Sequence, residues 1–428
     1  MRPEWESGLR GRLYGLGRRA IPLAWRRALR RHVRPERLLG IRKPPVDLPR
    51  LELDPGRARP GRADIIVLPV IAWTYRRQRP QQLAEALARR GRRVFYGSLR
   101  GSGEPEEAVG VAPGVTLLPI LGVRREDPSD RRLAEPALAA ALAGFAQARD
   151  RFDLREAALL VQSPFWGPLA AALRKRFGWR IVYDCLDDHE EFSTNRPQIL
   201  ASAERELART ADLVLATSEP LRQRMAAWDA KVQLLPNACD FALFGDLPAP
   251  TPAGSLTVGY VGAVDAWFDM DLLARLAALK PEWSFAIVGG LEDVAAVAPR
   301  LPNVVFYGER PHSEMPRLRE RFDVEIIPFR LSALTHATDP VKLYEAAAAG
   351  RMVVATPMQS LEPFARRGLI RLAATPEEFV REIEAAAAQG PQAAATLRAF
   401  ARENTWDIRA GMLETWLTEE GARGNVKT

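Results

Sequence analysis

Short, continuously apolar segments alternate with helical patterns along most of this chain, and this alternation constrains the fold more than any other feature. Strands are expected at 64–70, 92–98, 115–120, 158–164, 180–186, 212–218 and 232–238. Their residues do not alternate between apolar and polar, which is typical of strands buried on both faces of a parallel sheet. Helical patterns such as 78–91 and 203–211 separate them. The pattern predicts a doubly wound α/β domain.

The same alternation starts again after the segment GDLPAPTPAGS (245–255), which is rich in proline and has no periodicity. Further strands are expected at 256–262, 284–290, 303–309, 324–329, 352–357 and 369–375. We therefore expect two Rossmann-like domains, at 63–245 and 255–400, joined by one linker. Ligands of such domains bind at the carboxyl ends of the strands, so the cleft between the domains is the expected site.

Composition excludes several other classes of protein. Apolar stretches such as 138–146 are much shorter than the roughly 18–20 residues of a membrane span. Two cysteines, Cys185 and Cys239, and four histidines do not suffice for a disulfide framework or an obvious zinc site. We expect a cytoplasmic location, because a reducing compartment suits this cysteine content and no signal peptide is recognisable.

The basic charge of the chain is concentrated at its start. Residues 1–50 contain 14 Lys or Arg and 4 Asp or Glu, a local charge of +10 against +8 for the whole chain. We expect residues 1–62 to form a basic arm and linker. Segment 17–39 places arginines among apolar residues, which favours contact with an anionic membrane surface on the inner face of the cell membrane. A solvated tail is the alternative, since Pro22 and Pro35 interrupt the segment; no nucleic-acid partner is expected.

The segment TDPVKLYEAAAAGRMVVATP (338–357) predicts a helix followed by a strand. Asp339 is the expected N-cap, Pro340 suits the first turn, and Gly350 ends the helix. Lys342 and Glu345 lie three residues apart and hence on one face. A cation in the first turn opposes the helix dipole unless an anion lies in front of it, which favours a diphosphate site with Glu345 on a ribose. An exposed Lys–Glu pair without function is the alternative.

Several segments resemble one family of enzymes. GYVGAVDAWFDMDLL (259–273), VVFYGERPHSEMPRL (304–318) and DPVKLYEAAAAGRMVVATP (339–357) resemble the donor half of GT-B glycosyltransferases of the group-1 type, in the branch of teichuronic-acid and other polysaccharide glycosyltransferases. Segments 70–96 and 180–192 resemble the first half of that branch. Segment 401–417 is similar to its closing helix, so residues 401–418 are expected to pack back on the first domain.

The resemblance implies a GT-B fold and transfer of a hexose-type sugar from a nucleoside-diphosphate sugar to a polysaccharide or polyprenyl-linked acceptor, in cell-envelope glycan synthesis. It also implies a metal-independent hexosyltransferase without a cofactor, because a helix terminus and basic side chains do the work of a cation in this fold. Two alternatives remain open. One is a nucleotide-sugar epimerase of the same architecture, and the other is a non-catalytic subunit that binds nucleotide sugars.

The resemblance also assigns the donor residues. Glu345 would hold the ribose, Lys342 the diphosphate, and Gly262 would let the backbone approach the phosphates. The base would be flanked by Tyr307, Gly308, Glu309 and Arg310. Group-1 enzymes often carry a second glutamate eight residues before the ribose-binding one, but Ala337 stands there. This departure puts retaining stereochemistry in doubt and leaves His336, Thr338 and Asp339 as the candidates for substrate contact.

Candidate acceptor-side residues follow two of the expected strands. DCLDDHEEFSTN (184–195) places Asp184, Asp187, Asp188 and His189 after a buried strand. Asp187 or Asp188, and then His189, are the candidates for the group that orients or deprotonates the acceptor hydroxyl, with Asp184 contacting substrate. A solvated loop is the alternative.

The segment RRQRPQQ (76–82) follows the first strand and is also expected at the cleft floor. Arg76, Arg79 and Gln81 are predicted to bind the acceptor, because arginine grips phosphate through two hydrogen bonds and would suit a polyprenyl-diphosphate-linked substrate. Ordinary surface charge at a helix start is the alternative.

Overall fold

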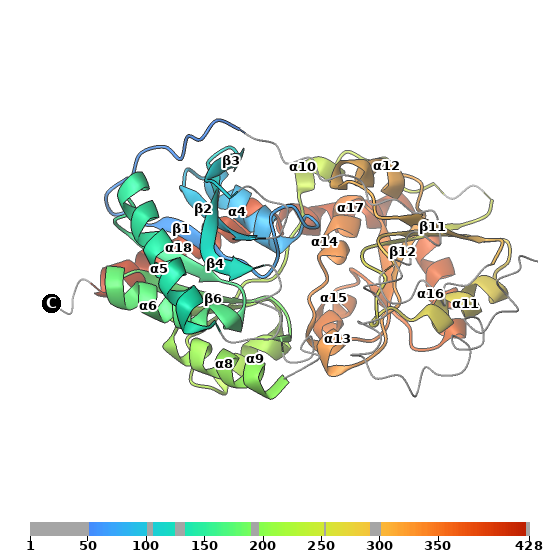
Figure 1. Cartoon of the computed structure of the whole chain (residues 1–428). Helices are drawn as coiled ribbons and strands as arrows, with labels where there is room; N and C mark the ends of the chain where they lie inside the picture. Colours follow the sequence, from blue (N-terminus) through green and yellow to red (C-terminus); the bar gives the residue numbers. More distant parts are fainter. Residues whose placement is uncertain are drawn as a thin grey trace, which may run out of the picture.

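The computed structural model describes residues 51–100, 106–124, 133–189, 197–251, 254–291 and 301–424. The segment 17–39, for which membrane contact is expected, lies outside these residues. Figure 1 shows two lobes side by side, each built around one sheet. We call them domain 1, which holds β1 to β8, and domain 2, which holds β9 to β14.

Domain 1 contains an eight-stranded sheet with the order β3-β4-β2-β1-β5-β6-β7-β8. Its strands are β1 (Asp64–Leu68), β2 (Val94–Arg100), β3 (Val109–Ala112), β4 (Val115–Arg124), β5 (Ala157–Val161), β6 (Arg180–Cys185), β7 (Leu213–Ala216) and β8 (Val232–Leu234). Its helices are α4 (Arg79–Arg89), α5 (Glu135–Phe152), α6 (Gly167–Phe177), α8 (Pro197–Thr210) and α9 (Glu219–Ala226), with a short 3₁₀ turn η3 (Pro164–Trp166).

Domain 2 contains a six-stranded sheet with the order β11-β10-β9-β12-β13-β14. Its strands are β9 (Thr257–Val261), β10 (Ser284–Val288), β11 (Val304–Gly308), β12 (Val324–Ile327), β13 (Met352–Ala355) and β14 (Arg371–Leu372). Around them lie α11 (Met270–Leu279), η5 (His312–Glu314), α12 (Met315–Arg319), α13 (Ala333–Ala337), α14 (Val341–Ala348), η6 (Gln359–Leu361), α15 (Glu362–Arg366), α16 (Pro376–Ala387) and α17 (Gly390–Arg402).

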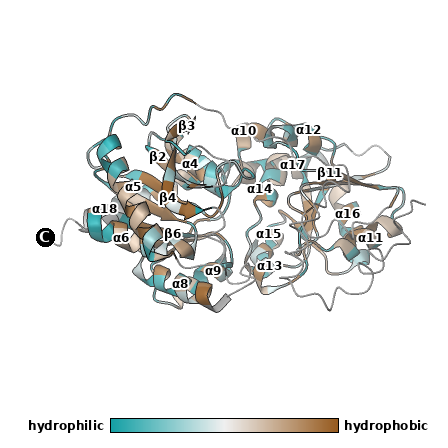
Figure 2. Ribbon diagram, viewed as in Figure 1, coloured by the Kyte–Doolittle hydropathy of each residue, from teal (hydrophilic) through white to brown (hydrophobic). Residues whose placement is uncertain are grey.

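Every strand expected from the apolar runs is present, and two doubly wound sheets confirm the predicted α/β fold class. All residues of β1, β5 and β7 are buried, as strands covered on both faces should be. Figure 2 shows apolar strands inside and polar helix faces outside. The pattern did not predict β3, which is short and pairs antiparallel with β4 at the sheet edge.

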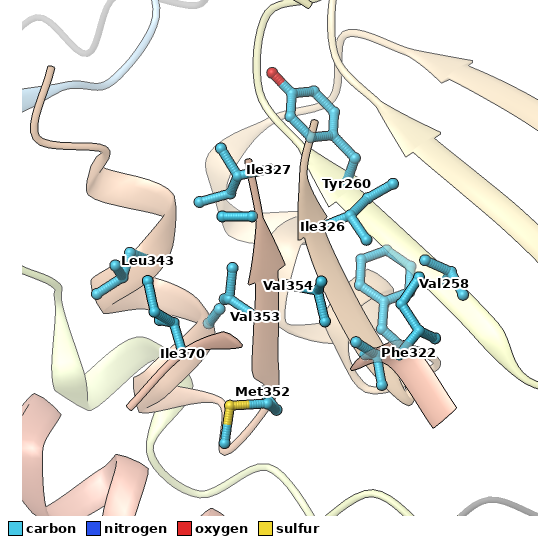
Figure 3. Packing of buried hydrophobic residues seen from close by; sticks show 14 of the residues in the cluster. Val258, Tyr260, Phe322, Ile326, Ile327, Leu343, Met352, Val353, Val354 and Ile370 are labelled. Carbon is cyan, nitrogen blue, oxygen red and sulfur yellow. The ribbon is translucent and has the colours of Figure 1, made fainter. Parts of the chain in front are cut away.

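The core of domain 2 packs α14 against the centre of its sheet. Figure 3 shows Leu343 of α14 beside Val353 of β13, with Tyr260 at the upper end of this cluster. The chain enters this core before the expected linker at 245–255. The short helix α10 (Phe241–Phe244) packs against α14, and Phe244 is fully buried there. Burial of these aromatic rings places the crossing a few residues earlier than the predicted boundary.

The chain then returns to domain 1 through α18 (Trp406–Gly424), which packs against α4. Trp406 and Leu413 join the apolar cluster around β1 and α4. Glu414 accepts hydrogen bonds from Arg90 at 2.5 Å and Arg92 at 2.8 Å. Although burial works in the opposite direction, bonds from the arginines lower the pKa of Glu414 to about 2. None of the helices in the described part of the chain is long and apolar enough for a membrane span.

Candidate functional site

The candidate donor site lies where α14 begins, beside the carboxyl ends of β9 and β12. Helix α14 begins at Val341 with Pro340 as its N-cap, so the expected cap at Asp339 is wrong. The Asp339 carboxylate instead accepts hydrogen bonds from the backbone N–H of Asn237, at 2.6 Å, and from the Tyr344 hydroxyl. It is therefore directed toward domain 1 rather than toward its own helix. Burial raises the pKa of Asp339 to about 6.

Lys342 stands in the first turn of α14 over two aromatic rings. Its Nζ lies 4.6 Å from the centroid of Phe329 and 5.1 Å from that of Tyr260. Among the described residues, no carboxylate oxygen lies within 4.0 Å of this Nζ. Burial lowers the pKa of Lys342 to about 8, although the charges of Glu345, Glu325 and Asp187 work in the opposite direction. The ammonium is held by ring faces and has room for an anionic ligand.

Three glycines at neighbouring strand ends bring the backbone close to Lys342. Gly262 after β9 has φ +145°, and a Cβ there would lie 2.7 Å from Lys342 Cε. Gly289 after β10 has φ +153°, and a Cβ there would lie 1.7 Å from the Gly262 oxygen. Its N–H donates to the carbonyl of Gly308, which ends β11. Sequence reasoning selected Gly262 but not Gly289, although both end an apolar run.

Glu345 lies one turn further along α14 and is buried, so the alternative of an exposed Lys–Glu pair is wrong. Its carboxylate accepts a hydrogen bond from Arg319 at 2.7 Å and lies 3.4 Å from Nε2 of His312. Arg319 is fully buried and also binds Glu325 at 2.6 Å. Burial works to raise the pKa of Glu345, but His312 and Arg319 outweigh it and hold the pKa below its usual value.

The sequence analysis missed His312 and Arg319. Both lie in the segment 304–318 or directly after it, and their spacing gave no signal because each contacts Glu345 only through the fold. They fix a carboxylate oxygen pair at the edge of the site. A ribose would use the remaining lone pairs of these oxygens.

The residues expected to flank the base follow β11. The Arg310 guanidinium donates to the carbonyl of Tyr307 at 3.1 Å. Glu309 accepts hydrogen bonds from Arg76 at 3.0 and 3.4 Å. This ion pair joins the loop after β1 in domain 1 to domain 2, and so brings together one residue predicted for the acceptor and one predicted for the base.

The acidic loop after β6 separates its candidates into two environments. Asp187 faces domain 2, where burial and the charge of Asp188 raise its pKa to about 7 while Thr338 and Lys342 work in the opposite direction. Asp188 turns into domain 1 and pairs with Arg224 at 2.7 Å. An Asp near pH 7 beside the donor site has the properties of a general base.

The third catalytic candidate, His189, is buried, and burial lowers its pKa to about 4, so its ring is neutral. Its Nε2 has no hydrogen-bond partner among the described residues. Arg224 connects this region to α8, because it also pairs with Glu204 at 3.2 Å. Neither Asp188 nor His189 faces Lys342 as Asp187 does.

Arg79 and Asp184, both predicted to bind substrate, form a buried ion pair at 2.8 Å. Arg79 also donates to the carbonyls of Leu235 and Pro236. The Gln81 amide donates to three carbonyls of the loop after β1, those of Ala72, Trp73 and Arg76. These three side chains are engaged in shaping the cleft wall of domain 1, so the structure offers them internal partners in place of substrate.

The loop before α14 connects the two domains. Ser218 donates to the Ala337 carbonyl at 2.5 Å, and Asn237 Nδ2 donates to the Asp339 carbonyl at 2.6 Å. Thr338 donates to the carbonyl of Leu334 and lies near Asp187. Nδ1 of His336 accepts the Gln359 backbone N–H at 3.0 Å. The donor helix is thus approached directly from domain 1.

Comparisons with known proteins agree with this architecture. Residues 77–238 match the family model of the glycosyl transferase 4-like domain, and residues 255–389 match that of the glycosyl transferases group 1. Together these matches span both domains and more than half of the chain. The chain therefore belongs to the group-1 glycosyltransferases of GT-B fold, as the resemblance in the sequence indicated.

Among curated proteins, the chain is similar to TuaH of Bacillus subtilis (strain 168), a protein named as a teichuronic acid biosynthesis glycosyltransferase. The two are 28% identical over 216 residues, which is 45% of this chain and 54% of TuaH. The matching part thus spans about half the length of that relative.

Solved structures share the fold at low sequence identity. Sucrose-phosphate synthase from Thermosynechococcus elongatus has a TM-score of 0.66 at 17% identity, over 85% of this chain and 100% of that one. HepE from Anabaena, solved in complex with UDP and glucose, has a TM-score of 0.61 at 16% identity, over 83% of this chain and 100% of that one. At these identities the likeness concerns the fold.

Proposed function

We propose that this chain transfers a hexose-type sugar from a nucleoside-diphosphate sugar bound by domain 2 to a glycan or polyprenyl-linked acceptor presented by domain 1, in synthesis of a cell-envelope polysaccharide. The observation that carries the proposal is Lys342, an ammonium in the first turn of α14 with aromatic contacts and no carboxylate partner among the described residues. Membership of the group-1 family and the similarity to TuaH support it.

In this proposal, the diphosphate lies in front of the first turn of α14. Lys342 supplies the positive charge, and Gly262 leaves space for the phosphate oxygens beside it. Glu345, oriented by Arg319, accepts hydrogen bonds from the ribose. The departing diphosphate gains negative charge as the sugar leaves, and the fixed ammonium stabilises it without reorganisation. The chemistry proposed here uses no metal ion and no cofactor.

Asp187 is the proposed base. Its raised pKa, close to 7, and its position against the donor loop allow it to take the proton of the acceptor hydroxyl as that oxygen attacks the anomeric carbon. We expect Asp187→Asn to lower kcat by at least tenfold while the dissociation constant for nucleoside diphosphate changes less than twofold. Asp150→Asn, a change at an exposed side chain of domain 1, is the matched control. Equal loss of nucleotide affinity would move Asp187 to the donor site.

Incubation with a panel of labelled UDP-, GDP- and dTDP-sugars tests the function itself. Transfer requires an added acceptor, such as a polyprenyl-diphosphate-linked glycan, and yields labelled glycan with free nucleoside diphosphate. An epimerase would change the donor sugar without an acceptor. A binding subunit would leave every donor unchanged, and either of these outcomes would contradict the proposed transfer.

A further inference from the structure

A cavity of about 620 Å³ lies between the domains, separate from the contacts of Lys342 and Glu345. Domain 1 contributes α9 and the loop after β6, and domain 2 contributes α13 and the turn η6. The volume is that of a small-molecule site. Figure 1 shows α9 and α13 facing each other across the lower part of the two lobes.

Asp188 supplies a fixed hydrogen-bond acceptor at this cavity. Its Oδ2 is held by Arg224 at 2.7 Å, whereas its Oδ1 is buried and has no partner among the described residues. A buried oxygen without a partner is costly in free energy, typically about 1–3 kcal/mol. A ligand hydroxyl or amine that donates to Oδ1 would remove this cost.

His336 supplies a fixed donor from the opposite wall. Because its Nδ1 accepts the N–H of Gln359, the neutral ring carries its proton on Nε2. The apolar parts of the wall come from Leu221 and Ala337, which are buried, and from Ala333. An acceptor, a donor and an apolar wall together match a sugar ring, which has hydroxyls at its edge and C–H groups on its faces.

The charges at the cavity disfavour an anion. Arg224 is the one Lys or Arg side chain among the described lining residues, and Asp188 and Glu204 both pair with it. Glu362 adds a further carboxylate to the lining. A uronate or phosphate would therefore meet two carboxylates and a guanidinium that is already paired.

We propose that this cavity binds an uncharged sugar ring of the acceptor and rejects anionic sugars, with Asp188 and His336 as the polar contacts. The proposal rests on the proposed transfer reaction. Asp187, the proposed base, adjoins Asp188 in the chain, so a ring bound at Asp188 would present a hydroxyl to Asp187.

The test measures binding of methyl glycosides to the full chain in the presence of UDP, by ligand-observed NMR. The probes are the methyl glycosides of glucose, galactose and mannose, and methyl glucuronide and galacturonide as anionic counterparts. At least one uncharged glycoside should bind tenfold or more tightly than either uronide. Ala333→Phe, which fills the cavity, and His336→Ala should each weaken this binding at least tenfold. Leu331→Phe adds the same ring at an exposed residue outside the lining and should change it less than twofold.

Three results would overturn the proposal. One is that no uncharged glycoside binds the wild-type chain, or that uronides bind as well. Another is that Ala333→Phe leaves glycoside binding unchanged. The third is that Ala333→Phe abolishes only the advantage of a UDP-sugar over UDP, which would assign the cavity to the donor sugar. If glycoside binding behaves as expected but no donor panel yields transfer, the proposed reaction fails while the cavity assignment stands.

Discussion

Lys342 has an unusual environment for a lysine, because two aromatic rings and burial replace the carboxylate that such a side chain ordinarily finds. Its lowered pKa follows from this setting, and a bound diphosphate would raise the pKa again. The residue thus couples its protonation to the presence of an anion.

This coupling predicts a pH dependence of donor binding. Anion binding favours protonated Lys342, so affinity should be full below the pKa of the free protein, about 8, and should fall as the pH rises through it. Calorimetric titration with UDP between pH 7 and pH 9.5 measures the effect. Lys342→Arg should show no such decline, because a guanidinium stays charged throughout this range. A wild-type affinity independent of pH would contradict the assignment.

Gly262 tests the geometry around the same ammonium. Gly262→Ala should weaken UDP binding at least tenfold, because the new methyl group would displace Lys342, and the positive φ adds strain of more than about 1 kcal/mol. Gly368→Ala is the control, since Gly368 has φ +69° but nothing within 4 Å of the added carbon. Equal loss of affinity in both variants would attribute the effect to strain alone.

At the scale of elements, α12, β12 and α14 are joined by Arg319, whose guanidinium lies between Glu325 and Glu345. Each of the three side chains is buried. Their arrangement orients Glu345 for the proposed ribose contact, and it also makes this corner of domain 2 depend on one cation.

Arg319→Met should lower the free energy of unfolding by about 3–5 kcal/mol, because it leaves two buried carboxylates without a partner. Urea denaturation followed by circular dichroism measures the change. Arg317→Met, at an exposed residue of the same helix, should change stability by less than about 0.5 kcal/mol. Equal stability of the two variants would show that the carboxylates find other partners.

The sequence predicted elements better than contacts. Continuous apolar runs predicted the strands, because burial on both faces leaves its mark in the chain itself. Lys342 and Glu345 could be selected because helix polarity gives their spacing a meaning. The partners of Glu345, His312 and Arg319, could not, because only packing of α12 on α14 brings them near. Arg79 and Asp184 have the composition of substrate ligands, yet each neutralises the other inside domain 1.

At the scale of the whole molecule, domain 1 contacts the loop before the donor helix through Ser218, Asn237 and Asp187. The base of the proposed reaction and the ammonium of the donor site therefore meet only when the two domains are together. This arrangement gives a physical reason for placing the donor and the acceptor on different domains.

The basic arm is the remaining feature at this scale. Residues 1–50 carry a net charge of +10, and the rest of the chain sums to −2 because the whole carries +8. The full chain should co-sediment with vesicles containing anionic lipid at low salt and less so at high salt, since each basic residue near such a surface contributes up to about 1 kcal/mol. The chain without residues 1–50 should stay in the supernatant and still bind UDP. Retention of the full chain in the supernatant at low salt would identify the arm as a solvated tail.

Donor binding at α14 is the central claim, and calorimetry tests it most directly. Wild-type chain, Lys342→Met and Lys280→Met are titrated with UDP, GDP and dTDP at pH 7. Lys280 is a surface lysine paired with Glu384, so its variant controls for loss of one positive charge. At least one nucleotide should bind the wild type and Lys280→Met alike, and should bind Lys342→Met about 10–100-fold more weakly, as loss of a charge-assisted bond of about 1.5–3 kcal/mol requires. Unchanged affinity in Lys342→Met, or no nucleotide binding by the wild type, would contradict the account.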